Sequence, residues 1–161
     1  MCKMQNKSLL ARLKDTKNTL AVSESITGGN LQAEIVKESG ISEVFKGGIT
    51  AYCLEQKVKH LGVNRKHAEL VNCVSQQVAV EMAIGCSRLF NTTIGIATTG
   101  YAEPSTSIKQ AHAYWAIYFK KPHFSLYTGQ IIIPKTTSRA SAQKYVAREI
   151  HRKLRELLIK P

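Results

Sequence analysis

The chain lacks the features that mark membrane, secreted, metal-binding and disulfide-stabilised proteins. No stretch approaches the roughly 20 apolar residues needed to span a bilayer, and residues 1–7 are polar and basic, without the apolar core of a secretory signal. The four cysteines are widely spaced and form no C-x-x-C pair, and the five histidines show no metal-ligand spacing such as H-x-x-x-H. These absences predict a cytoplasmic protein with reduced thiols, no metal or organic cofactor, and no membrane association.

Acidic residues are scarce, since 11 Asp and Glu stand against 23 Lys and Arg, which gives a net charge of +12. A surplus of this size attracts anionic partners over long range but does not identify them. No RNA- or DNA-recognition motif accompanies it, and the basic residues near the C-terminus fall on one face of an amphipathic helix, which predicts a solvated face. These basic residues are Lys144, Arg148, Arg152 and Arg155. A nucleic-acid partner is therefore not expected.

The order of apolar patterns predicts one α/β domain covering residues 1–161. A length of 161 residues suits a single core, and the chain has no internal repeat, low-complexity segment or linker. Strand-like and helix-like patterns alternate, which predicts a three-layer α/β/α sandwich, with the last two strands paired as a hairpin across residues 120–123. The expected strands are 19–23, 49–54, 93–98, 112–119 and 125–133, and the expected helices are 9–14, 31–36, 55–61, one capped by Ser75, and 138–158.

The segment 21–29 is a candidate site, because a buried strand ends there in hydroxyls, a carboxylate and two glycines before a helix begins. Glycines at such a turn allow close approach of the backbone to a ligand. Ser25 would lie on this turn. The N–H groups of Thr27, Gly28 and Gly29 would be free at the helix start, suited either to a developing oxyanion or to a phosphate. The sequence alone does not choose between these two roles.

Together, several motifs closely resemble one family, the CinA C-terminal domain. They are E-S-x-T-G-G at 24–29, G-G-x-x-A-Y-x-x-x-x-K at 47–57, L-G-V at 61–63, and Val74-Ser75 opening a helix. The resemblance covers 9–158 and is strongest in the first half. It implies a nicotinamide mononucleotide amidohydrolase (deamidase), a mixed sheet of about five strands in an anticodon-binding-domain-like arrangement, and a homo-oligomer, expected to be a dimer.

The family's proposed catalytic dyad maps onto Ser25 and Lys57. Both residues follow expected strands, so a strand-helix-strand crossover could bring them together at the carboxyl ends of the strands. A neutral lysine can take the proton of a serine hydroxyl, which requires desolvation to lower the lysine pKa. The Tyr52 hydroxyl could bridge Ser25 and Lys57 or orient the substrate amide, although a half-buried strand tyrosine is an ordinary alternative.

Glu24 would point away from Ser25 in an extended backbone, where it could pair with a basic residue or bind a ribose hydroxyl. Structural and binding roles are equally supported for this carboxylate. Thr99 and Gly100 lie in the segment that occupies the place of the family's S-G-I-A-G-P loop, which helps to form the nucleotide pocket.

Two positions in the expected pocket region concern the phosphate of the substrate. Glu103 stands where the family has a glycine, so its bulk and charge would narrow the pocket or repel a phosphate. Arg139 aligns with the first arginine of the family's G-D-R-x-x-V-R segment and could hold the phosphate, whereas Gln143 replaces the second.

The sequence thus predicts an enzyme that converts nicotinamide mononucleotide and water to nicotinate mononucleotide and ammonia. Two alternatives stay open. A degenerate family member could bind a nucleotide without hydrolysing it, as the altered loop from Gly100 to Ser107 would allow. The basic surface could instead belong to a nucleic-acid-associated module, an interpretation with less support because no recognition motif accompanies the charge.

Overall fold

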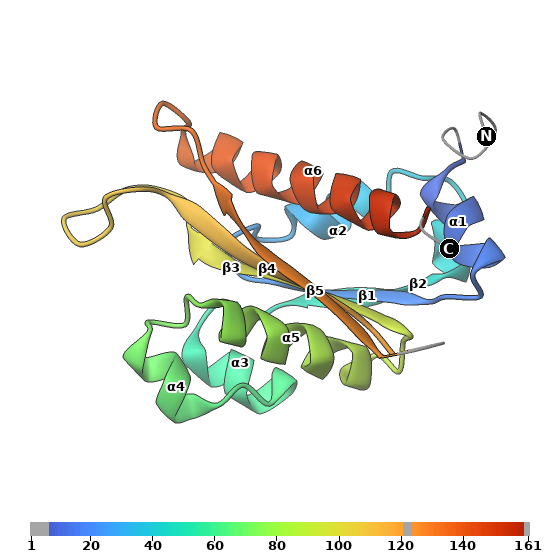
Figure 1. Ribbon diagram of the computed structural model, residues 1–161, viewed down its shortest axis with the longest axis horizontal. Coiled ribbons are helices and arrows are strands. Elements are labelled where there is room, and N and C mark those ends of the chain that lie inside the picture. Colours follow the sequence, from blue (N-terminus) through green and yellow to red (C-terminus); the bar gives the residue numbers. More distant parts are fainter. Residues whose placement is uncertain (1–6, 121–123, 160–161) are drawn as a thin grey trace.

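The computed structural model describes residues 7–120 and 124–159, and it consists of one five-stranded sheet between two layers of helices (Figure 1). The predicted three-layer α/β/α sandwich is confirmed. The strands are β1 (Leu20–Glu24), β2 (Phe45–Thr50), β3 (Ile94–Tyr101), β4 (His112–Phe119) and β5 (Ser125–Ile132). The helices are α1 (Leu9–Asp15), α2 (Asn30–Ile35), the short 3₁₀ helix η1 (Ile41–Glu43), α3 (Leu54–Leu61), α4 (Arg65–Leu70), α5 (Gln76–Leu89) and α6 (Arg139–Leu157).

The sheet is mixed, as predicted, and its strands follow the order β2-β1-β3-β4-β5. β1 runs parallel to both β2 and β3, whereas β4 is antiparallel to β3 and β5. The three parallel strands therefore terminate at the same end of the sheet, hereafter the carboxyl end. Loops that follow parallel strands converge at this end, which is where open α/β sheets place their ligands.

Two hydrophobic cores hold the layers together. On one face α2 and α6 cover the sheet, with α1 at one end of the layer, and on the other face lie α3, α4 and α5 (Figure 1). The apolar stripe of α6, which includes Val146 and Ile150, is buried in the first core. The stripe of α5, which includes Val78 and Met82, is buried in the second. The cores fix both helix layers against the strands that carry the candidate site.

Three boundaries differ from the prediction. The strand expected at 49–54 begins and ends four residues earlier, because Gly48 lies in close contact with β1: a Cβ there would come within 2.6 Å of the Val22 carbonyl oxygen. β3 continues to Tyr101, since its pairing with β4 extends to His112. The β4–β5 hairpin forms as expected, but residues 121–123 of its connection lie outside the described part.

None of the described helices combines the length and the apolar character needed to cross a membrane.

Candidate active site

Ser25 lies directly after β1, on a turn that glycine makes possible. Gly28 and Gly29 have φ values of +57° and +99°, in the left-handed region that glycine adopts without strain. Helix α2 begins at the next residue, Asn30. Ser25 itself is nearly buried, with 8% of its surface exposed, and it lines a cavity at the carboxyl end of the sheet.

Glu24 holds this turn in place. Its carboxylate is fully buried and accepts hydrogen bonds from the backbone N–H groups of Gly29 (2.9 Å), Leu31 (3.0 Å) and Gln32 (2.8 Å). A helix leaves its first N–H groups without partners, and a carboxylate at that end satisfies them and complements the helix dipole. Of the two roles expected for Glu24, these contacts support the structural one, although the partners are backbone N–H groups rather than the basic residue considered from sequence.

The same contacts change the expected oxyanion donors. The N–H of Gly28 donates to the Ser25 carbonyl oxygen at 3.2 Å, and that of Gly29 donates to Glu24. These two groups are thus occupied, contrary to the prediction. Within the described residues, the N–H groups of Ile26 and Thr27 have no hydrogen-bond acceptor, and Ile26 lines the cavity. The Thr27 hydroxyl is paired with the hydroxyl of Thr98, 2.8 Å away.

Lys57 is the largest fully buried side chain, although lysine is normally exposed. It is the fourth residue of α3, and its Nζ lies 3.0 Å from Ser25 Oγ, 2.8 Å from the Ala51 carbonyl oxygen and 3.1 Å from the Tyr52 carbonyl oxygen. No carboxylate contacts Nζ within the described part of the chain. The Ser25–Lys57 pairing predicted from sequence is thus present as a direct contact.

Burial lowers the pKa of Lys57 below its ordinary value, and the thiols of Cys73 and Cys53 oppose this effect to a smaller extent. A neutral amine has two N–H donors and one lone pair. The two carbonyl oxygens can accept the donors, which leaves the lone pair directed at the Ser25 hydroxyl. This arrangement suits a base that removes the serine proton.

Tyr52 does not bridge the pair. Its side chain is 57% exposed, and its hydroxyl accepts a hydrogen bond from Arg139 Nη2 at 2.7 Å. The carbonyl oxygen of Tyr52, rather than its hydroxyl, contacts Lys57. The predicted bridging role is therefore wrong, and the hydroxyl belongs to the cavity mouth.

The cavity next to Ser25 and Lys57 has a volume of about 370 Å³. Thr99 and Gly100 line it as expected from the loop motif, but the Thr99 hydroxyl is used within the wall, where it donates to the Cys73 carbonyl oxygen at 2.7 Å. Gly100 pairs with Ala113 inside the sheet. These residues therefore shape the wall rather than offer side-chain donors.

Two wall residues were not predicted. Asn72 and Cys73 both line the cavity, with φ values of +49° and +60°, and the Asn72 amide donates to the Tyr101 hydroxyl at 3.2 Å. They lie between α4 and α5 in a loop without a recognisable motif, so no sequence signal marks them.

Arg139 and Glu103 meet at the mouth of this cavity. Arg139 Nη1 lies 3.2 Å from Glu103 Oε2, and both side chains are about half exposed. The hydrogen bond to Glu103, followed by the interactions with Tyr52, raises the pKa of Arg139. Gln143 lies nearby on α6, where its Nε2 would be 3.6 Å from a Cβ at Gly28.

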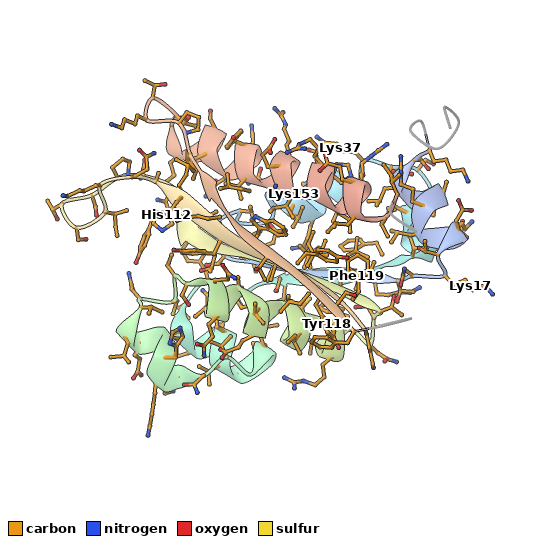
Figure 2. The ribbon with its side chains drawn as sticks, viewed as in Figure 1. Lys17, Lys37, His112, Tyr118, Phe119 and Lys153 are labelled. Atoms are coloured by element: carbon orange, nitrogen blue, oxygen red, sulfur yellow. The ribbon has the colours of Figure 1, made fainter. Side chains whose placement is uncertain are left out.

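His112 begins β4 (Figure 2) and contacts Tyr101, which lines the cavity. Its ring packs edge-on against Tyr101 and Tyr114, with centroid distances of 5.7 Å and 5.5 Å. Nδ1 lies 2.8 Å from the Gln110 carbonyl oxygen. The described residues contain no group of three or more His, Cys, Asp or Glu side chains placed to hold a metal ion.

Fold and site together define an α/β/α domain with a buried serine–lysine pair at the carboxyl end of its sheet. The family model of the CinA C-terminal domain matches residues 3–156, and the chain belongs to that family.

Curated relatives extend beyond this chain. A protein of Clostridioides difficile (strain 630), named for competence-damage induction, is 36% identical over 144 residues, which are 88% of this chain and 32% of the relative. A CinA-like protein of Kosmotoga olearia is 42% identical over 93 residues, 58% of this chain and 23% of the relative. The chain thus spans about a quarter to a third of these two relatives.

Solved structures share the fold over most of their length. The competence or damage-inducible protein of Enterobacter asburiae is 27% identical, with a TM-score of 0.78 over 93% of this chain and 91% of that one. The competence damage-inducible protein A of Klebsiella pneumoniae subsp. pneumoniae MGH 78578 is 23% identical, with a TM-score of 0.84 over 92% of this chain and 91% of that one.

Proposed function

We propose that the protein is an amidohydrolase that deamidates nicotinamide mononucleotide to nicotinate mononucleotide and ammonia. The observation that carries this proposal is the 3.0 Å contact between Ser25 Oγ and the buried Nζ of Lys57 beside an open cavity. Burial lowers the pKa of Lys57, and a general base must be available in its neutral form. The identity of the substrate rests on the resemblance to the CinA family, and a cavity of about 370 Å³ is within the usual range for a small ligand.

In the first half-reaction, Ser25 Oγ attacks the carboxamide carbon while its proton passes to Lys57 Nζ. The carbonyl oxygen becomes an oxyanion, for which the free N–H groups of Ile26 and Thr27 are the nearest backbone donors in sequence to the nucleophile. The ammonium of Lys57 then protonates the amide nitrogen, the C–N bond breaks, and ammonia leaves an acyl-serine ester.

In the second half-reaction, Lys57 acts as base toward water. Water attacks the ester carbon and gives one proton to Nζ, and the resulting tetrahedral intermediate collapses with Ser25 Oγ as the leaving group. Lys57 returns the proton to Oγ, so the free enzyme is regenerated, and the carboxylic acid releases the remaining proton of water to solvent to become a carboxylate. Lys57 thus carries each proton that moves to or from Oγ.

The test is ammonia release from nicotinamide mononucleotide by the wild type, Ser25→Ala, Lys57→Met and the double variant. Each single change should abolish release, and the double variant should match either one, because the pair acts as a unit. Lys59→Met is the matched control, since Lys59 is an exposed lysine on the same helix, and it should keep full activity. Circular dichroism checks that all variants fold.

The result that would contradict the proposal is substantial ammonia release by folded Ser25→Ala. A wild type that binds the nucleotide and releases no ammonia would instead support the second candidate, a nucleotide-binding protein. The specific observation favouring that candidate is the Glu103 carboxylate at the cavity mouth, a bulky group where the family has glycine.

A further inference from the structure

Three side chains are joined by two hydrogen bonds at the mouth of the candidate site. Glu103 follows β3, Tyr52 follows β2, and Arg139 begins α6, so three separate parts of the fold contribute to it. Arg139 donates from Nη1 to Glu103 Oε2 (3.2 Å) and from Nη2 to Tyr52 Oη (2.7 Å). We call this group the Glu103–Arg139–Tyr52 clamp. All three residues line the same cavity as Ser25 and Lys57.

The clamp uses the atoms with which arginine binds phosphate. An arginine binds a phosphate through paired N–H groups of its guanidinium fork. In this protein each terminal nitrogen of Arg139 already has a partner inside the molecule. These bonds use two of the five N–H donors of Arg139, and a phosphate that approached it would compete with the Glu103 carboxylate, an anion already bound to that guanidinium.

The charges around the cavity also indicate that Glu103 weakens the binding of a phosphate. Its charged lining residues are Glu103 and Arg139, which cancel, and Lys57, which burial favours in the neutral form. Glu103 therefore offsets the positive charge of Arg139 that would otherwise attract a dianionic phosphate. A ligand without a phosphate does not need the guanidinium of Arg139 and so loses nothing through its pairing with Glu103.

We infer that Glu103 determines the substrate class of this site: by occupying Arg139, it favours the unphosphorylated, cationic riboside of nicotinamide over the phosphorylated nucleotide. This inference rests on the proposed function, because it assumes that the cavity binds a pyridine carboxamide. It goes beyond that proposal by naming the residue that sets the preference and the direction of the preference.

The expected size of the effect follows from the charge. Glu103→Gln leaves the charge of Arg139 uncompensated, and such a unit charge roughly 6 Å from a phosphate, at an effective dielectric constant of about 20, would change affinity by about a hundredfold without screening. Both clamp side chains are half exposed, so solvent and salt reduce this effect. We expect a change in the dissociation constant on the order of tenfold.

The experiment measures binding rather than turnover. Isothermal titration calorimetry would compare nicotinamide mononucleotide with nicotinamide riboside, in the Ser25→Ala protein and in the same protein carrying Glu103→Gln. The second change should tighten mononucleotide binding about tenfold and leave riboside binding unchanged or weaker. The matched control is Glu156→Gln, which removes a half-exposed carboxylate paired with Arg152 at the far end of α6.

A third protein distinguishes occupation of Arg139 by Glu103 from direct repulsion between Glu103 and the phosphate. Adding Arg139→Gln to the Glu103→Gln protein should remove most of the gain in mononucleotide affinity, because Glu103 acts chiefly by occupying Arg139. A gain that survives in full without Arg139 would overturn the clamp.

The remaining outcomes are distinct. If both ligands bind and Glu103→Gln leaves their affinity ratio unchanged, the inference fails while the proposed function stands. If neither ligand binds any of these folded proteins, the proposed function fails, and the inference fails with it.

Discussion

Lys57 combines deep burial with contacts to neutral oxygen atoms only, and this combination makes its protonation state sensitive to pH in a predictable direction. Because burial lowers its pKa, the amine is charged below the depressed pKa and neutral above it. Only the neutral form can accept the Ser25 proton. We therefore expect kcat/KM for deamidation to rise with pH through that pKa, as an acid limb.

Steady-state ammonia release across a range of buffers would measure this limb. The Lys59→Met control should show the same profile as the wild type. An activity that stays constant from acid to neutral pH would contradict the assignment of Lys57 as the base.

Glu24 illustrates a residue whose role is structural although it adjoins the nucleophile. Glu24→Ala would leave the three N–H groups at the start of α2 without their acceptor, and the N–H of Leu31 is buried. We expect the free energy of unfolding to fall by about 2 to 4 kcal/mol. Urea denaturation would measure it.

The control for this change is Glu34→Ala, on the same helix. The Glu34 side chain is 22% exposed and pairs with that of Lys37, which is 64% exposed, and an ion pair this accessible to solvent contributes about 1 kcal/mol or less. Equal losses for the two variants would show that the buried carboxylate does not stabilise the turn.

At the scale of elements, the close contact between α3 and α5 positions Lys57, the proposed base. Gly85 of α5 lies against the end of α3, where an ideal Cβ would be 2.0 Å from the Leu61 carbonyl oxygen. Alanine normally favours a helix over glycine by about 1 kcal/mol. Here we expect the opposite sign, with Gly85→Ala destabilising the protein by about 1 to 3 kcal/mol through overpacking.

Because α3 also carries Lys57, Gly85→Ala should lower ammonia release as well as stability. Chemical denaturation and the activity assay measure the two effects. Gln77→Ala, at an exposed position of α5, should alter stability by less than about 0.5 kcal/mol. A stabilised Gly85→Ala protein would mean that α3 and α5 can separate without cost.

The sequence predicted the elements better than their local contacts. Apolar periodicity identified α5 with its Ser75 cap, and α6 to within one residue at each end, because burial of one face dominates those segments. It misplaced β2, because two adjacent glycines, Gly47 and Gly48, are typical of a turn in sequence. In the structure both pair with residues of β1 and belong to the strand. The motifs placed Ser25 and Lys57 correctly, but the partners of Glu24 and Tyr52 depend on side-chain directions that no spacing encodes.

For the whole molecule, the charge surplus is distributed over the surface rather than concentrated at the candidate site. Lys144, Arg148 and Arg152 of α6 are exposed, as predicted for a solvated face, whereas Arg155 is half-buried and donates to the Lys7 carbonyl oxygen at 3.0 Å. Lys153, labelled in Figure 2, has its Nζ 5.1 Å from the ring centroid of Trp115. Of the charged side chains that line the cavity beside Ser25, Glu103 and Arg139 are paired with each other. The net charge of +12 belongs to the whole chain and does not by itself predict that this cavity binds anions. The homo-oligomer stays a prediction.

The two halves of the chain contribute different kinds of residue to the candidate site. Ser25 and Lys57 come from the first two strand–helix units, whereas Glu103 and Arg139 come from the loop after β3 and the start of α6. Under the proposed function, bond cleavage and ligand choice are thus encoded in separate stretches of the gene. Mutations at codons 103 and 139 could therefore change the preferred substrate without altering Ser25 or Lys57. Such a separation allows a domain to acquire new substrates without first losing activity.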